Sequence, residues 1–174
     1  MNIKVDNKTT ICSWQENHID GLLKHANSND ITKYLGDTFP HPYTKSDADS
    51  WIEFNNNLEE NLNFAILVND NCVGGIGIIK SKDIYRKTIE IGYWIGTEFQ
   101  NKGIISKSVK RFTEYCFNSF DIHRIQAKVF SNNEASKKVL IKCNYTEEAV
   151  LKDAIYKNDT FLDLHLFRIL KSDF

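Results

Sequence analysis

This chain of 174 residues lacks the features that mark secreted, membrane-spanning or metal-binding proteins. Its four cysteines are scattered and form no C-x-x-C pair, so neither a zinc site nor a disulfide framework is predicted. No apolar run reaches the length of a membrane span, and no charged stretch followed by an apolar one opens the chain. These absences favour a cytoplasmic protein that holds no metal and contacts no membrane.

Positively and negatively charged residues are present in nearly equal numbers. Lysine and arginine together number 22 against 23 aspartates and glutamates, which gives a formal net charge of -1. Such a balance offers no general attraction to nucleic acid, so any basic character must be local. A hydrophobic content of 41% is ordinary for a globular protein, and the length predicts a single domain over residues 1–174.

Two common nucleotide-binding motifs are also missing. From Gly96 the chain reads Gly-Thr-Glu-Phe-Gln-Asn-Lys-Gly, which does not fit the Walker A pattern. A dinucleotide fingerprint beginning at Gly75 fails because Lys80 stands where its third glycine should be.

A change of periodicity in residues 89–106 predicts a phosphate-binding junction. Apolar residues alternate up to Ile95, as in a strand, and after Gly103 they recur with helical spacing. The polar loop Gln100-Asn101-Lys102-Gly103 joins the two parts. Backbone N–H groups at a helix start attract anions, and a glycine lets the backbone approach a ligand closely. Positive charge is added by Lys102, Lys107, Lys110 and Arg111.

The remaining patterns predict a mixed sheet flanked by helices. A capping box is expected where Thr44 and Asp47 begin a helix. Strands are predicted at residues 9–14, 64–68, 73–79, 89–95 and 124–130, with a closing pair that includes residues 160–170. A hairpin around Asn69-Asp70-Asn71 is expected to join the second and third of these strands. Helices are predicted at residues 15–27, 30–35 and 44–62, after Gly103, and from Asn133.

Two segments resemble the GCN5-related N-acetyltransferase (GNAT) superfamily, and more narrowly its RimJ/RimL branch, whose named members acetylate ribosomal-protein N-termini. The first is Gln-x-x-Gly-x-x at residues 100–105, after the strand Ile-Gly-Tyr-Trp-Ile, and is similar to the family's acetyl-CoA motif [QR]-x-x-G-x-[GA]. The second, residues 133–145, is similar to the family's N-x-x-S-x-x-V-L-x-K-x-G-F. This chain departs from the pattern at Ile105, normally a small residue, and at Asn144, normally glycine.

The resemblance implies the GNAT fold, an α/β (mixed α+β) fold with a central, mostly antiparallel, twisted sheet. In that family two parallel strands splay apart and the pantetheine arm of acetyl-CoA enters the gap, here beside residues 93–95 and 124–130. The cofactor-binding residues so implied are Tyr93, Trp94, Ile95, Gln100, Asn101, Lys102, Gly103, Ile104, Ile105, Ser106 and Asn133. Core packing by the side chains of Tyr93 and Trp94, and helix capping by Asn133, remain compatible alternatives.

The catalytic residues are harder to assign. Ser136 can protonate the departing thiolate, or only cap its helix, and Glu90 can deprotonate the amine through a water, or only form an ion pair. The tyrosine acid of many relatives is replaced by Leu140, and a glutamate base of some members of the branch by Ile155. Cys143 falls on an apolar helix face, which favours packing over a nucleophilic role.

Three functions stay open. An α-amine is roughly 14% neutral at pH 7 and a lysine about 0.04%, a difference of about 3.5 kcal/mol. A site without an obvious base therefore favours transfer from acetyl-CoA to a protein N-terminus, such as that of a ribosomal protein, by direct attack. The alternatives are a small amine acceptor (a polyamine or antibiotic) and a catalytically weak acyl-CoA-binding module. The apolar residues of segment 160–170 suggest a homodimer.

Overall fold

The computed structural model describes all residues from 1 to 174 and contains one eight-stranded sheet in the order β1-β2-β3-β4-β5-β6-β8-β7. The neighbours β5 (Thr88–Ile95) and β6 (Arg124–Phe130) run parallel. The pairs β1–β2, β2–β3, β3–β4, β6–β8 and β7–β8 are antiparallel. Five α-helices accompany the strands, which confirms the predicted mixed α/β fold class.

The chain forms two compact units, here called the first unit (residues 1–77 and 93–108) and the second unit (residues 78–92 and 109–174). The boundary between them cuts three elements: β4 (Asn71–Lys80), β5 and α4 (Ile104–Ser119). No helix of the structure is long and apolar enough to cross a membrane.

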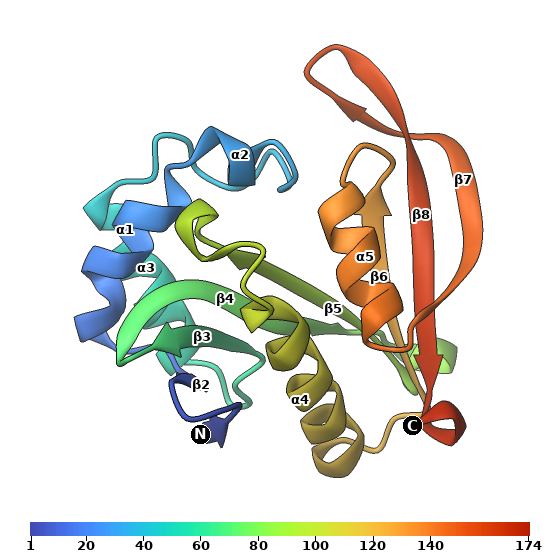
Figure 1. Cartoon of the computed structure of the whole chain (residues 1–174), viewed down its shortest axis with the longest axis horizontal. Coiled ribbons are helices and arrows are strands. Elements are labelled where there is room, and N and C mark those ends of the chain that lie inside the picture. Colours follow the sequence, from blue (N-terminus) through green and yellow to red (C-terminus); the bar gives the residue numbers. More distant parts are fainter. The chain divides into compact units, whose positions relative to one another are not determined.

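In the first unit, helices α1 (Ile19–Ala26) and α3 (Lys45–Asn56) lie side by side, with β3 (Asn63–Val68) and β4 nearby (Figure 1). These helices and strands share one hydrophobic core. Its buried members are Cys12, Trp14, Leu22, Ala26, Tyr43, Ala48, Ile52, Ala65, Leu67 and Cys72. The unit also contains β1 (Asn2–Lys4), β2 (Thr9–Ser13) and the short helix α2 (Asn29–Thr32).

Local hydrogen bonds explain where α3 begins and ends. The Thr44 hydroxyl accepts the N–H of Asp47 at 3.3 Å, and the Asp47 carboxylate accepts the N–H of Thr44 at 2.8 Å, so the predicted capping box is confirmed. The helix ends at Asn56, before the predicted limit at residue 62. Asn55 donates its side-chain amide back to the carbonyl of Trp51 at 2.7 Å, a bond that competes with helix continuation.

The hairpin between β3 and β4 is tighter than expected. Asn69 and Asp70 have φ values of 48° and 63°, and β4 begins at Asn71. Two consecutive residues with positive φ form the mirror-image turn that matches the twist of a two-residue hairpin. The turn therefore uses two residues rather than the three predicted.

In the second unit, odd-numbered residues of β5, β6 and β8 (Thr160–Leu170) point to one buried face of the sheet. Buried residues of α4 and α5 (Glu134–Lys142) complete this core. The main members are Ile89, Ile91, Val109, Phe112, Cys116, Ile125, Ala127, Val129, Leu140, Phe167 and Ile169. Even-numbered residues of the same strands form the opposite face.

The parallel pairing of β5 with β6 covers only part of both strands. It joins Thr88, Ile89 and Glu90 to Arg124, Ile125 and Gln126, although β5 continues to Ile95 and β6 to Phe130. Next along the sheet, β8 and the edge strand β7 (Thr146–Lys157) form a long hairpin whose register shifts at Glu147 and again at Leu151.

Candidate active site

The junction between β5 and α4 is held in the first unit by backbone hydrogen bonds. The N–H of Gly96 donates to the carbonyl of Val73 on β4 at 2.8 Å. A single 3-10 turn (Thr97–Phe99) follows, and the N–H of Gln100 donates back to Thr97 at 3.2 Å. The loop after β5 is therefore anchored to the neighbouring strand and reaches the start of α4 in a defined conformation.

Two residues with positive φ turn this loop into the helix, Asn101 at 58° and Gly103 at 75°. The first helical hydrogen bond of α4 runs from the N–H of Lys107 to the carbonyl of Gly103, at 3.2 Å. The N–H groups of Ile104 and Ile105 precede that bond, at the positive end of the helix dipole. No acidic residue occupies the first turn of α4. This backbone geometry is the one that an anion site at a helix start requires, and the anion site itself stays a prediction.

The space over Gly103 is open. A Cβ atom built on this glycine would meet no heavy atom within 4 Å. A ligand group can therefore reach the backbone at the start of α4, and a pyrophosphate fits a site whose donors are main-chain amides.

The positive charge around the loop is smaller than the sequence suggests. Lys107 Nζ lies 2.8 Å from a carboxylate oxygen of Asp6, and Arg111 pairs with Glu114. The hydrogen bond from Lys107, together with the backbone N–H of Lys8, holds the pKa of Asp6 well below its usual range. Lys102 instead places its ammonium over the ring of Phe99, 5.4 Å from the centroid. Two of the four expected cations are therefore already neutralised.

Glycines on β4 allow it to pass close to β5 beside the predicted pantetheine-binding residues. A side chain at Gly74 would collide with the carbonyl of Trp94, and a Cβ at Gly75 would lie 2.7 Å from its indole nitrogen. The Trp94 side chain packs against the core of the first unit, which confirms the alternative that this side chain has a packing role. Sequence reasoning did not identify these glycines, because their partner lies about twenty residues away on another strand.

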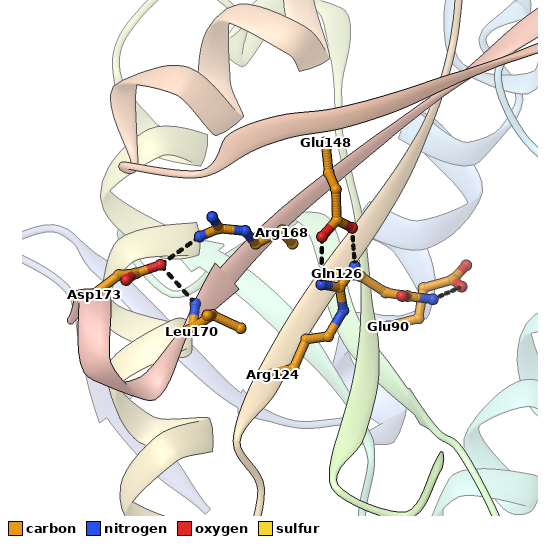
Figure 2. A network of polar contacts seen from close by, with 7 residues as sticks. All are labelled: Glu90, Arg124, Gln126, Glu148, Arg168, Leu170 and Asp173. Atoms are coloured by element: carbon orange, nitrogen blue, oxygen red, sulfur yellow. Dashed lines mark hydrogen bonds and ion pairs between the residues drawn. The ribbon is translucent and has the colours of Figure 1, made fainter.

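Glu90 lies on the even-numbered face of the second unit, among several ion pairs of neighbouring strands (Figure 2). Its Oε2 atom is 2.9 Å from the ammonium of Lys128 and accepts a hydrogen bond from the side chain of Gln126 at 3.4 Å. Ile89 and Ile91 on either side are buried in the opposite face. The expected ion-pair interpretation of Glu90 is confirmed, and its role as a base stays a prediction.

Asn133 and Ser136 belong to the start of α5. The side-chain oxygen of Asn133 accepts the N–H of Ser136 at 3.1 Å, so Asn133 is the N-cap of this helix. Both residues, like Glu90, belong to the second unit, whereas residues 93–106 belong to the first.

Comparisons with known proteins agree with this geometry. Residues 8–146, drawn from both units, match the family model described as the acetyltransferase (GNAT) domain. The chain belongs to the GNAT N-acetyltransferases. An uncharacterised N-acetyltransferase of Bacillus licheniformis is 31% identical over 161 residues, covering 89% of this chain and 88% of the relative. The ribosomal-protein-serine acetyltransferase of Escherichia coli is 26% identical over 176 residues, covering 98% and 97%.

Solved structures show the same GNAT fold. RimL, a ribosomal α-N-protein acetyltransferase solved in complex with coenzyme A, superposes with a TM-score of 0.87 at 21% identity over the full length of both chains. The microcin self-immunity acetyltransferase MccE, solved in complex with acetyl-CoA and AMP, has a TM-score of 0.81 at 26% identity, covering 96% of this chain and 94% of MccE.

The departure from the GNAT pattern at Asn144 has a local explanation. Asn144 has a φ of 65°, and its N–H donates to the carbonyl of Ile141 at 3.0 Å. The N–H of Tyr145 donates to Leu140, also at 3.0 Å. These two bonds form a Schellman motif at the end of α5, a position that glycine usually takes and asparagine also tolerates. Asn144 therefore preserves the helix end.

The cysteines of this GNAT enzyme are all free and buried. Burial raises the pKa of Cys143 to about 11, and those of Cys72 and Cys116 to about 12. A thiol with so high a pKa is protonated at neutral pH and is a poor nucleophile. The structure contains no group of three or more His, Cys, Asp or Glu side chains that could hold a metal ion.

Proposed function

We propose that this GNAT enzyme acetylates the α-amine of a protein or peptide N-terminus, such as that of a ribosomal protein, using acetyl-CoA. The observation that carries the proposal is the open backbone site at Gly103, where the N–H groups of Ile104 and Ile105 begin α4. Backbone donors at a helix start suit a pyrophosphate, and they do not depend on the size of the side chain at Ile105.

In this proposal, acetyl-CoA is bound through one continuous segment of the first unit. The pyrophosphate interacts with Gln100, Asn101, Lys102, Gly103, Ile104, Ile105 and Ser106. The pantetheine amides pair with the backbone of Tyr93, Trp94 and Ile95, as an added strand would. The structures of RimL in complex with coenzyme A and of MccE in complex with acetyl-CoA support this cofactor.

The reaction proposed is a direct transfer. The neutral amine attacks the thioester carbonyl, a C–N bond forms, and the C–S bond breaks to release coenzyme A. Glu90 accepts the proton that the amine loses, through a water, and Ser136 supplies a proton to the departing thiolate. Asn133 fixes the start of α5 and therefore the position of Ser136. The buried Cys143, with its raised pKa, forms no acyl-enzyme.

An α-amine is proposed as acceptor because it needs less help from a base. At pH 7 its neutral fraction is about 350-fold larger than that of a lysine, and this ratio corresponds to a free-energy difference of about 3.5 kcal/mol. The similarity to the ribosomal-protein-serine acetyltransferase of Escherichia coli supports this class of acceptor. Four buried cysteines that form no disulfide fit a reducing compartment such as the cytoplasm.

The proposal is tested by incubating the protein with acetyl-CoA and three acceptors. These are a peptide with a free N-terminus, the same peptide with a blocked N-terminus and one internal lysine, and spermidine. Mass spectrometry is expected to find one acetyl group on the free α-amine and little on the other two. Acetylation of only the lysine peptide or spermidine would contradict the proposed acceptor.

A further inference from the structure

The even-numbered face of the second unit has an opening beside the carboxylate of Glu90. Gly92 follows Glu90 on the same face of β5, since the two are separated by one residue. A Cβ atom built on Gly92 would meet no heavy atom within 4 Å, so the space next to the carboxylate is open. The next residue, Tyr93, begins the segment proposed to pair with pantetheine. An amine bound over Gly92 would therefore lie next to Tyr93, the first residue of the segment proposed to pair with pantetheine.

Lys128 occupies the position beside Glu90 that the acceptor amine would take in its protonated form, before it loses its proton and attacks the thioester. Its Nζ lies 2.9 Å from Glu90 Oε2, and its side chain is 47% exposed. Exposed ion pairs contribute at most about 1 kcal/mol, so an incoming ammonium can displace it. The other cations on this face are held more firmly, because Arg124 is bound by two oxygens of Glu148 and Arg168 pairs with Asp173 (Figure 2). Lys128 is therefore the cation next to Glu90 that a ligand can most readily replace.

We propose that the acceptor amine binds Glu90 above Gly92 in place of Lys128, and that the released Lys128 selects acceptors with a carboxylate close to the amine. This inference rests on the proposed function and names the acceptor class more narrowly. Once displaced, the Lys128 ammonium stays on the same strand face as the bound amine, because Lys128 and Glu90 are on the same face of neighbouring strands. It attracts an acidic residue next to the N-terminus and repels a second cation, so polyamines and N-termini followed by lysine are poor acceptors.

The test compares two peptides that differ only in the second residue, glutamate or lysine, in each of four proteins. These are the wild type, Lys128→Met, Lys128→Glu and Lys152→Met. Lys152 is the matched control, because it also lies in the second unit and forms an exposed ion pair of 2.9 Å, with Asp163. Acetyl-CoA binding is measured separately and confirms that each variant is folded.

The wild type and Lys152→Met are expected to favour the glutamate peptide about fivefold in kcat/KM. The preference is expected to disappear in Lys128→Met and to reverse in Lys128→Glu, a reversal that a merely structural role for Lys128 would not produce. Gly92→Ala is expected to raise the KM for both peptides without weakening acetyl-CoA binding. An equal preference in all four proteins would overturn the inference and leave the proposed function standing. If no protein acetylated either peptide while acetyl-CoA still bound, the proposed function would fail and the inference with it.

Discussion

The carbonyl oxygen of Gly103 accepts the first helical hydrogen bond of α4, from the N–H of Lys107 at 3.2 Å. This bond places the start of the helix directly after a glycine with a φ of 75° and leaves open space above it. At the same time Lys107 directs its ammonium to Asp6, 2.8 Å away, so the anion site depends on backbone amides more than on this side chain. An anionic ligand that binds this site must therefore place its negative charge close to the backbone N–H groups at the start of α4.

Ser136→Ala is expected to lower turnover only modestly, by about tenfold or 1.4 kcal/mol, because coenzyme A is a good leaving group. Cys143→Ala is expected to leave turnover nearly unchanged, since the thiol is buried and its pKa is raised to about 11. Steady-state kinetics with a peptide acceptor checks both. Loss of all activity in Cys143→Ala with cofactor binding intact, or a trapped acetyl-cysteine, would show that the transfer is not direct.

Gly74→Ala is expected to destabilise the protein, because the added Cβ collides with the carbonyl of Trp94, and a backbone atom cannot move aside cheaply. We expect a loss of about 1–3 kcal/mol in the free energy of unfolding. Gly36→Ala is the control, since its Cβ would meet only the Thr38 hydroxyl at 3.8 Å, an ordinary contact. Urea unfolding measures both variants, and equal stability would contradict the close approach of β4 to Trp94.

Two buried histidines are expected to make the protein less stable in mild acid. Burial lowers the pKa of His18 and of His25 below the usual 6.5, although Glu98 partly opposes this at His25. The unfolded chain therefore binds protons that the folded chain excludes. Stability should be constant above about pH 6.5, the ordinary histidine value, and fall as the pH drops below it.

His25 also connects this pH dependence to the loop after β5, because its ring packs edge-on against that of Phe99, with the ring centroids 5.4 Å apart. Urea unfolding at pH 7.5 and 5.5 is expected to show the loss, and His18→Gln and His25→Gln are each expected to show less of it. An identical pH dependence in the wild type and in both His→Gln variants would rule out these residues as its source.

Local patterns predicted much of the fold because their hydrogen bonds lie within a few residues. The capping box of Thr44 and Asp47 and the N-cap at Asn133 are of this kind. The strand β6 was predicted with its exact limits, since the burial of Ile125, Ala127 and Val129 follows a strict alternation. The three-residue strand β1 was missed, because a single buried residue, Ile3, gives no periodicity.

The site was predicted less completely, because its charges are arranged by contacts between distant residues. Asp6 and Lys107 are separated by 101 positions, and nothing in either local sequence links them. The pairing of Lys128 with Glu90 depends on the parallel register of β5 and β6, which a single sequence does not reveal. The sequence therefore predicts which residues form the site, but it does not predict which residues form ion pairs with them.

A homodimer is expected to involve the β7–β8 hairpin. The ring centroids of Tyr156 and Phe161 lie 5.0 Å apart near its turn, with the rings tilted by 49°, and the two residues are 59% and 62% exposed. Aromatic side chains are enriched at protein–protein interfaces, so this exposed pair is where we expect a partner copy to bind. Light scattering at micromolar concentration should give twice the mass of the chain, and Phe161→Lys should give a monomer. A monomeric mass for the wild type would exclude this assembly.

The most direct test of the account is titration of acetyl-CoA into the wild type, Gly103→Ala and Gly103→Asp by calorimetry. Alanine at a φ of 75° costs about 1–2 kcal/mol of backbone strain but adds no charge, so Gly103→Ala should still bind. Gly103→Asp places a carboxylate against the pyrophosphate and should weaken binding at least tenfold, about 1.4 kcal/mol. Gly36→Asp, on an exposed loop of the same unit, should bind as the wild type does. If folded Gly103→Asp binds acetyl-CoA with wild-type affinity, the cofactor site is not at the start of α4.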